Sequence, residues 1–250
     1  MRVDPRGAPL VLRVPLTDDQ RRQVLEQTGY DVSALPYASG ATAVLCTFRG
    51  IILRVPRGVF VPTAATEHLL YAAIEAASAF PRPTIVDVGT GCGVVALAAA
   101  AALPRASVFA TDVSDVALGA ARSNRARLRL HNVRFCRGSL LSPLPRRLFH
   151  RVAVVVANVP YVPPQLADVA EYAYPEGTAI GPGEDGLGLV RELADSARQF
   201  LMPGGLLVLQ LAAFQWAGFG SALTTLGYKA PELEQASIDA PVTGRIVWPG

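Results

Sequence analysis

The sequence predicts an α/β fold with a mostly parallel seven-stranded sheet and an antiparallel pair of strands at the C-terminal edge. From residue 84 onward, short apolar runs alternate with segments of helical length, which is typical of a parallel sheet with helices on both faces. The turn after the first of these runs is rich in glycine, which allows a sharp change from strand to helix. The last two runs differ from the rest and look like a closing pair of strands.

Length and composition fit one such domain with a small appendage, because the chain has 250 residues, of which 51% are apolar and 17% charged. The longest uninterrupted apolar run, residues 94–103, has ten residues. A membrane-spanning helix needs about 20. The first ten residues lack the apolar core of a secretory signal. We therefore expect a cytoplasmic protein with no membrane partner.

The segment before the sheet is expected to add a small helix and a β-hairpin. Thr17 is a suitable helix N-cap, because two acids follow it where the helix dipole favours them, and the helix should end near Gly29. Strands at residues 43–48 and 51–55, around Arg49-Gly50, predict the hairpin. The expected divisions are a short helical appendage at 1–35, the hairpin and its linker at 36–62, and the main domain at 63–250.

The main domain begins with a helix that ends before Pro81-Arg82-Pro83, a sequence that interrupts regular structure. Helices are predicted at residues 66–79, 92–103, 114–128 and about 187–201. Strands are predicted at residues 84–88, 107–111, 133–136, 152–157, 206–211, 228–237 and 242–248. The run 152–157 is apolar throughout, which predicts a strand that is buried on both faces.

Cysteine and histidine are too dispersed to predict a metal site or a disulfide framework. No CxxC pair occurs, and the number of cysteines is odd. The residues concerned are Cys46, Cys92, Cys136, His68, His131 and His150. We expect no metal.

The first candidate site is the glycine loop Asp87-Val-Gly89-Thr-Gly91-Cys-Gly93, at the turn from strand to helix. Glycines let the backbone approach a ligand closely, and a helix N-terminus offers unpaired N–H groups. The spacing is GxGxG, whereas the dinucleotide-binding pattern GxGxxG would need glycine at Val94. A carboxylate at Asp87 would repel a pyrophosphate and attract a cationic amino acid.

A second acid, Asp112, lies nineteen residues after Gly93, at the end of the next strand. An acid in this place can accept hydrogen bonds from both hydroxyls of a ribose. The alternative interpretation is that Asp87 and Asp112 only cap loops. The two acids and the glycines together favour S-adenosylmethionine over NAD as the cofactor.

The second candidate site is Asn158-Val159-Pro160-Tyr161, directly after the apolar strand 152–157. The carboxyl ends of parallel strands face the ligand in open α/β sheets. A planar NH2 group would lie against Tyr161 and donate hydrogen bonds to the Asn158 side chain and the Val159 carbonyl. These acceptors would orient the nitrogen and stabilise positive charge that develops on it during methyl transfer. The alternative is a turn with a buried tyrosine.

These motifs resemble those of the protein-(glutamine-N5) methyltransferases that modify peptide-chain release factors, whose pocket motif is Asn-Pro-Pro-Tyr. Other segments agree with this family in the same order, over roughly residues 35 to 248: Leu35-Pro36-Tyr37, Gly58-Val-Phe-Val-Pro62, Thr66-Glu67, Gly183-Glu-Asp185-Gly186-Leu187 and Pro203-Gly204-Gly205. The resemblance implies a Rossmann-like class I S-adenosylmethionine-dependent fold, with residues 63–250 as the catalytic domain. It also implies methyl transfer to an amide or amine nitrogen.

The resemblance also implies roles for individual residues. Cofactor-binding residues would be Asp87, Gly89, Thr90, Gly91, Gly93, Asp112, Val113, Ser139, Leu140 and Asn158. Catalytic residues would be Asn158, Val159, Pro160 and Tyr161. Substrate-binding residues would be Phe60, Thr66, Asn158 and Tyr161.

The sequence departs from the family at several positions. Val159 replaces the first proline of the pocket motif, and Ser139 stands where many members carry an acid that reaches the adenine amine. Gln210 replaces the usual Glu of the fifth strand, and residues 62–67 lack the Arg and the first Glu of the family's Pro-Arg-Pro-Glu-Thr-Glu segment. The N-terminal helical domain of the family corresponds here to about 35 residues.

These departures leave the methyl acceptor open. A protein glutamine side chain is one candidate, and an amide or amine of a small molecule in a biosynthetic pathway is the alternative. Methylation of a nucleic-acid base and a scaffold without catalysis are less favoured, the latter because Asn158, Pro160 and Tyr161 are intact. The sequence makes no prediction of the oligomeric state.

Charge is unevenly distributed along the chain, whose net charge is +3. From Val116 to Ala167 there are nine arginines and no acid. Such a stretch can steer a polyanion. Because 22 of the 23 basic residues in the whole chain are Arg, we favour a solvated face and expect no nucleic-acid partner.

Overall fold

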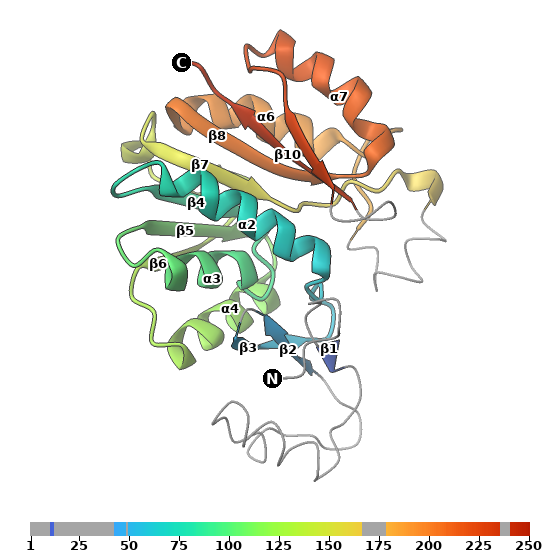
Figure 1. The fold of residues 1–250 in the computed structure, drawn as a ribbon. Helices are drawn as coiled ribbons and strands as arrows, with labels where there is room; N and C mark the ends of the chain where they lie inside the picture. The colour runs from blue at the N-terminus through green and yellow to red at the C-terminus, as the bar shows by residue number, and fades with distance from the viewer. Residues whose placement is uncertain (1–10, 13–42, 49, 167–178, 236–240) are drawn as a thin grey trace.

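The computed structural model describes residues 11–12, 43–48, 50–166, 179–235 and 241–250 (Figure 1). The helix expected at 17–29 and the motif Leu35-Pro36-Tyr37 lie outside these residues. The hairpin is present, as β2 (Ala43–Phe48) and β3 (Ile51–Pro56), and β1 (Val11–Leu12) pairs antiparallel with β2.

The predicted seven-stranded sheet is confirmed. Its strands are β4 (Thr84–Val88), β5 (Ser107–Asp112), β6 (Val133–Arg137), β7 (Val152–Ala157), β8 (Leu201–Leu211), β9 (Glu232–Gln235) and β10 (Val242–Val247). The strand order is β6-β5-β4-β7-β8-β10-β9. The first five strands in this order are parallel, and β10 is antiparallel to both β8 and β9. After β6 the chain returns to the other side of β4, which creates a crevice at the carboxyl ends of β4, β5 and β7.

Helices cover both faces of this sheet, as Figure 1 shows. They are α2 (Ala64–Ser78), α3 (Val94–Ala102), α4 (Asp115–Arg127), α6 (Gly188–Phe200) and α7 (Ala213–Thr225), with short 3-10 turns at Arg146–Leu148 and Pro164–Leu166. Alternate residues of β7 contact opposite cores: Val154 and Val156 pack with α2 and α3, whereas Val155 packs with α6 and α7. None of the described helices is both long and apolar enough to cross a bilayer.

Four features differ from the sequence-based expectation. The strand β1 lies in the appendage expected to be helical. The strand β9 begins at Glu232, four residues later than predicted, and the Tyr228 N–H instead donates to the Leu223 carbonyl of α7.

The helix α7 was not expected, because it contains two glycines, Gly218 and Gly220, and begins after an alanine rather than a capping Ser, Thr, Asp or Asn. Burial of Trp216, Phe219 and Leu223 holds it on the sheet instead. The strand β8 begins at Leu201, five residues earlier than predicted, because Leu201 pairs with Val152 before a register shift.

Candidate active site

The glycine loop connects β4 to α3 with three glycines in the left-handed region. Their φ angles are 71° at Gly89, 55° at Gly91 and 87° at Gly93. Gly89 and Gly91 line a cavity, whereas Gly93 packs on α4. A Cβ atom at Gly93 would lie 3.0 Å from the Cβ of Ala121. The first two glycines therefore face the ligand space, and the third permits close packing of helices.

Asp87 supports this loop from beneath and does not line the cavity. Its Oδ2 accepts hydrogen bonds from the Thr90 hydroxyl at 2.6 Å and from the Ala96 N–H of α3 at 3.0 Å. Burial raises the pKa of Asp87 to about 6, in spite of these hydrogen bonds, and the charge of Asp112 acts in the same direction as burial. Asp87 and Thr90 hold the loop in shape, because they tie its start and middle to α3.

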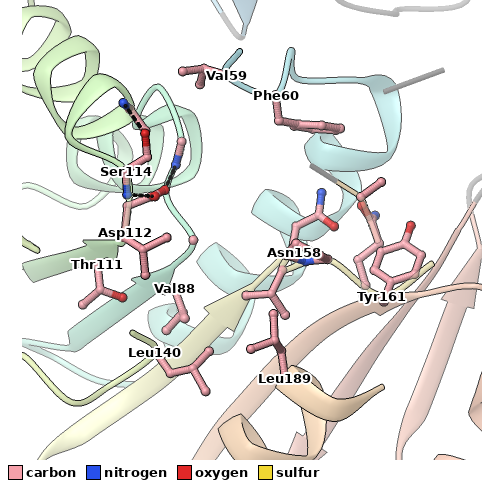
Figure 2. A pocket seen from close by; sticks show the side chains of 18 of the residues that line it. Val59, Phe60, Val88, Thr111, Asp112, Ser114, Leu140, Asn158, Tyr161 and Leu189 are labelled. Carbon is pink, nitrogen blue, oxygen red and sulfur yellow. Dashed lines mark hydrogen bonds between the residues drawn. The ribbon is translucent and has the colours of Figure 1, made fainter. Parts of the chain in front are cut away.

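Asp112, at the end of β5, lines the cavity and also holds the loop (Figure 2). Its Oδ2 accepts a hydrogen bond from the Gly91 N–H at 2.8 Å, and its Oδ1 accepts one from the Ser114 N–H at 2.9 Å. Each carboxylate oxygen has room for a further donor. The carboxylate is thus positioned by the backbone and can still bind hydroxyl groups in the cavity.

The cavity has a volume of about 330 Å³ and lies at the carboxyl ends of the central strands. Cavities of this size hold small-molecule ligands. Its lining residues are Gly58, Val59, Phe60, Thr63, Val88, Gly89, Gly91, Thr111, Asp112, Val113, Ser114, Ala117, Gly138, Ser139, Leu140, Asn158, Val159, Pro160, Tyr161, Val162, Ala179, Leu189, Gln210 and Pro241. Figure 2 shows Asp112, Val88 and Leu140 on one side and Asn158 and Tyr161 on the other.

Most of the residues expected at the site lie together in this cavity, and four do not. Asp87, Thr90 and Gly93 belong to the supporting side of the glycine loop. The fourth, Thr66, is buried in the first turn of α2, where its hydroxyl accepts a hydrogen bond from the Thr63 N–H at 3.1 Å. Thr66 therefore stabilises the start of the helix.

Other lining residues were missed. The rule that ligands bind at strand ends would have identified Val88 and Thr111, because they end β4 and precede Asp112. Leu189 lies at the start of α6 and Pro241 directly before β10; only the three-dimensional fold brings them to the cavity, and no local pattern indicates them.

The linker after the hairpin covers one side of the cavity through Val59 and Phe60. Asn124 of α4, which is fully buried, holds the hairpin in place. Its side chain accepts a hydrogen bond from the Arg54 N–H at 2.9 Å and donates to the carbonyls of Arg54 and Cys92, both at 3.0 Å. One amide side chain thus joins β3, α4 and the glycine loop.

The two ends of the cavity differ in charge. Asp112 is the only charged residue among the described lining residues, and it lies on the side of the glycine loop. Around Asn158 and Tyr161 the described lining is apolar or neutral. Gln210, which stands where the resembling family has Glu, donates a hydrogen bond from Nε2 to the Ala65 carbonyl at 2.7 Å.

Comparisons with known proteins agree with this architecture. A family model described as ribosomal protein L11 methyltransferase (PrmA) matches residues 63–183. A methyltransferase from Pyrococcus furiosus superimposes with a TM-score of 0.60 at 18% identity, over 92% of this chain and 98% of that one. A ribosomal protein L11 methylase from Lactobacillus delbrueckii subsp. bulgaricus gives 0.56 at 22% identity, over 78% and 83%. The fold is that of class I S-adenosylmethionine-dependent methyltransferases.

Several sequence relatives carry the name release factor glutamine methyltransferase. The relative from Deinococcus radiodurans is 38% identical over 200 residues, which are 78% of this chain and 67% of the relative. The relative from Koribacter versatilis is 34% identical over 74% of this chain and 68% of its own length. The relative from Streptomyces coelicolor is 40% identical over 67% of this chain, and the match spans 60% of the relative's length. The chain belongs to the release factor glutamine methyltransferase family.

Proposed function

We propose that the chain transfers a methyl group from S-adenosylmethionine to the side-chain amide nitrogen of a glutamine in a protein of the release factor class. The observation that carries the proposal is the cavity itself. It joins a carboxylate suited to ribose, Asp112, to an uncharged end formed by Asn158 and Tyr161. The names of the relatives support the protein substrate.

The described residues fit the cofactor. Gly89 and Gly91 bring backbone to the cavity wall without side chains, and Asp112 offers carboxylate oxygens for ribose hydroxyls. Val88, Val113 and Leu140 provide apolar surface for a nucleobase, and Ser139 adds a neutral polar edge. When bound, S-adenosylmethionine supplies a methyl group attached to a positively charged sulfur.

The neutral acceptor end favours an amide over a cationic amine. A protonated amine would lose its hydration in the cavity, and an uncharged lining gives it no compensating carboxylate. A primary amide needs only hydrogen-bond acceptors for its NH2 group, which the Asn158 side chain and the Val159 carbonyl provide. We therefore favour glutamine over a small-molecule amine.

In this proposal, the protein accelerates the reaction by holding the acceptor amide nitrogen in position. The nitrogen of an amide is a weak nucleophile, because its lone pair is delocalised into the carbonyl. Acceptors that hold its two N–H bonds orient the lone pair and stabilise the positive charge that develops on nitrogen. A proton on the methylated nitrogen can leave to water afterwards, so a strong base at the nitrogen is not required.

The proposal assigns residues 63–250 as the catalytic domain. The hairpin and linker of 36–62 contribute the covering residues Gly58, Val59 and Phe60. The contact from Asn124 to Arg54 gives this cover a fixed position.

The decisive experiment supplies purified bacterial release factor, a cell extract and radiolabelled S-adenosylmethionine to the wild-type protein. Label is expected in the glutamine of the release factor. Label in small molecules of the extract, with none in protein, would favour the small-molecule alternative and overturn the proposed acceptor.

Asn158→Ala separates binding from chemistry. The resemblance also counts Asn158 among the cofactor-binding residues, but in this proposal its side chain acts on the acceptor. The variant should therefore bind S-adenosylmethionine within about twofold of wild type, whereas its single-turnover rate should fall by about 10²–10³, as for loss of one transition-state hydrogen-bonding group. Calorimetry and rapid-quench kinetics measure the two quantities. Asn158→Asp, which keeps an acceptor oxygen, should retain part of the rate. A wild-type rate in Asn158→Ala would make Asn158 a turn residue only.

A further inference from the structure

Gln215 is a buried polar residue in the first turn of α7 that the proposed mechanism has not used. Its exposed fraction is 4%. Its Oε1 accepts a hydrogen bond from the Ala212 N–H at 3.1 Å. Its Nε2 donates to the Tyr161 carbonyl at 2.7 Å and to the Asp185 carbonyl at 2.9 Å. Both N–H bonds of the amide are therefore in use.

These partners fix the orientation of the amide. Two carbonyl oxygens require donors, and the Ala212 N–H requires an acceptor, so the reversed amide would place Oε1 against two oxygens. Gln215 joins three segments that are far apart in sequence: the start of α7, the pocket motif and the loop that precedes α6.

The joined loops already lie very close to each other. A Cβ atom at Gly186 would be 2.4 Å from the Tyr161 oxygen, and one at Gly181 would be 2.8 Å from the Pro160 oxygen. The Val162 N–H donates to the Ala179 carbonyl and the Gly181 N–H donates to the Val162 carbonyl, both at 2.9 Å. The pocket motif is thus held by its neighbours on one side and by Gln215 on the other.

We propose that Gln215 is a positioning residue, which fixes the backbone of Tyr161 so that Asn158 and Tyr161 keep the geometry needed to hold the acceptor amide. The inference rests on the proposed function. Gln215 does not line the cavity, so it acts through the pocket motif. Without its two donors, the part-buried hydrogen bonds to the Tyr161 and Asp185 carbonyls would be lost, and the loop would move to replace them.

Gln215→Glu is the informative variant, because it keeps the size of the side chain and the acceptor for the Ala212 N–H but removes both donors. Gln215→Met, which has neither donor nor charge, separates loss of the donors from introduction of a charge. Gln199→Glu makes the same chemical change at an exposed position of α6 and serves as the matched control.

Three measurements test the role: affinity for S-adenosylmethionine by calorimetry, single-turnover rate against release factor concentration, and hydrogen exchange of the Val162 and Gly181 amides. In both Gln215 variants we expect cofactor affinity within about twofold of wild type. The maximal rate should fall at least tenfold, which corresponds to 1.4 kcal/mol at 25 °C. The two amides should exchange at least tenfold faster, and Gln199→Glu should match wild type throughout.

The outcomes are distinguishable. If wild type methylates release factor and both Gln215 variants match its maximal rate, the positioning role is wrong. If the rate falls but the Val162 and Gly181 amides exchange as in wild type, the role is also wrong, because the loop has not moved. If wild type transfers no methyl group to release factor, the proposed function fails, and amide exchange alone decides whether Gln215 holds the loop. A loss of cofactor affinity in step with the rate would indicate general damage and overturn the inference.

Discussion

At the scale of single residues, the two acids beside the glycine loop have different roles. The sequence offered two interpretations for Asp87 and Asp112, ligand or loop cap. Both are caps in the structure, because each accepts hydrogen bonds from the backbone or from a neighbouring hydroxyl. Only Asp112 also faces the cavity. Spacing alone placed both near the glycine loop, but the direction of a side chain depends on the face of its strand.

Asp87→Asn should change how stability depends on pH. The raised pKa, about 6 against 3.8 for an ordinary Asp, means that the folded protein keeps a proton that the unfolded chain releases between about pH 4 and 6. Wild-type stability should therefore fall as pH rises through this window and level off above it. At 1.36 kcal/mol per pKa unit, the loss is up to about 3 kcal/mol.

The Asp87→Asn variant should not lose stability over this pH range, because Asn carries no titratable proton. Its amide oxygen can still accept hydrogen bonds from the Thr90 hydroxyl and the Ala96 N–H. Urea unfolding of both proteins from pH 4 to 7.5 measures the difference, which should grow in favour of Asp87→Asn as pH rises. Asp115→Asn, at an exposed carboxylate of α4, controls for loss of one charge. A difference that stays constant with pH would contradict a buried, protonated Asp87.

The sequence placed at one site those residues that are contiguous along the chain, and their catalytic role stays a prediction. The segment Asn158–Tyr161 follows its strand directly, and all four residues line the cavity. Gln215 was missed, because its importance comes from contacts with Tyr161 and Asp185, which are 54 and 30 residues away along the chain. No local pattern distinguishes such a glutamine from a helix-surface residue.

At the scale of elements, α7 shows where sequence patterns failed. The two glycines of α7 lower its intrinsic helix propensity, so the stability of this helix depends on the packing of its buried side chains against the sheet. Trp216 lies against Gly244 of β10, where a Cβ atom would be only 2.1 Å from the indole ring. The indole N–H donates to the Val242 carbonyl at 3.2 Å. A glycine in a strand, which usually weakens it, here makes room for the helix.

Gly244→Ala should destabilise the protein by about 1–3 kcal/mol or more, because the added methyl group overlaps the Trp216 ring and forces α7 away from the sheet. Gly218→Ala is the matched control in α7 itself, where an added Cβ meets nothing within 4 Å. That variant should be more stable by about 0.5–1 kcal/mol, because alanine favours a helix over glycine. Urea unfolding measures both changes. Equal effects of the two substitutions would contradict the packing of Trp216 on Gly244.

At the scale of the whole molecule, the sheet was predictable because its strands are continuous apolar runs. All seven strands and the antiparallel edge were identified from the sequence. The strand order follows from the fold rules that the resemblance implied and not from any local signal. The cavity forms because this order places the ends of β4, β5 and β7 side by side, with the hairpin linker across them. The position of the cavity therefore follows from the order of the strands in the sheet.

A ligand that contacts all these strand ends stabilises the whole folded unit, so cofactor identity can be read from thermal unfolding. S-adenosylmethionine at about 100 times its Kd should add about 2.7 kcal/mol. For a domain of this size, that corresponds to a rise in Tm of about 5–11 °C. NAD at the same concentration should give no rise, because the glycine loop has GxGxG spacing and Val94 stands where the dinucleotide-binding pattern GxGxxG needs glycine.

Asp112→Ala supplies the control for this comparison. Loss of charge-assisted hydrogen bonds should weaken S-adenosylmethionine binding by roughly tenfold to a hundredfold, about 1.5–3 kcal/mol. At the concentration used for wild type, the rise in Tm of a folded Asp112→Ala variant should then be about half of the wild-type rise or less. Differential scanning fluorimetry measures all three cases. An equal rise with NAD, or an undiminished rise in Asp112→Ala, would mean that this cavity does not hold the adenosyl cofactor through Asp112.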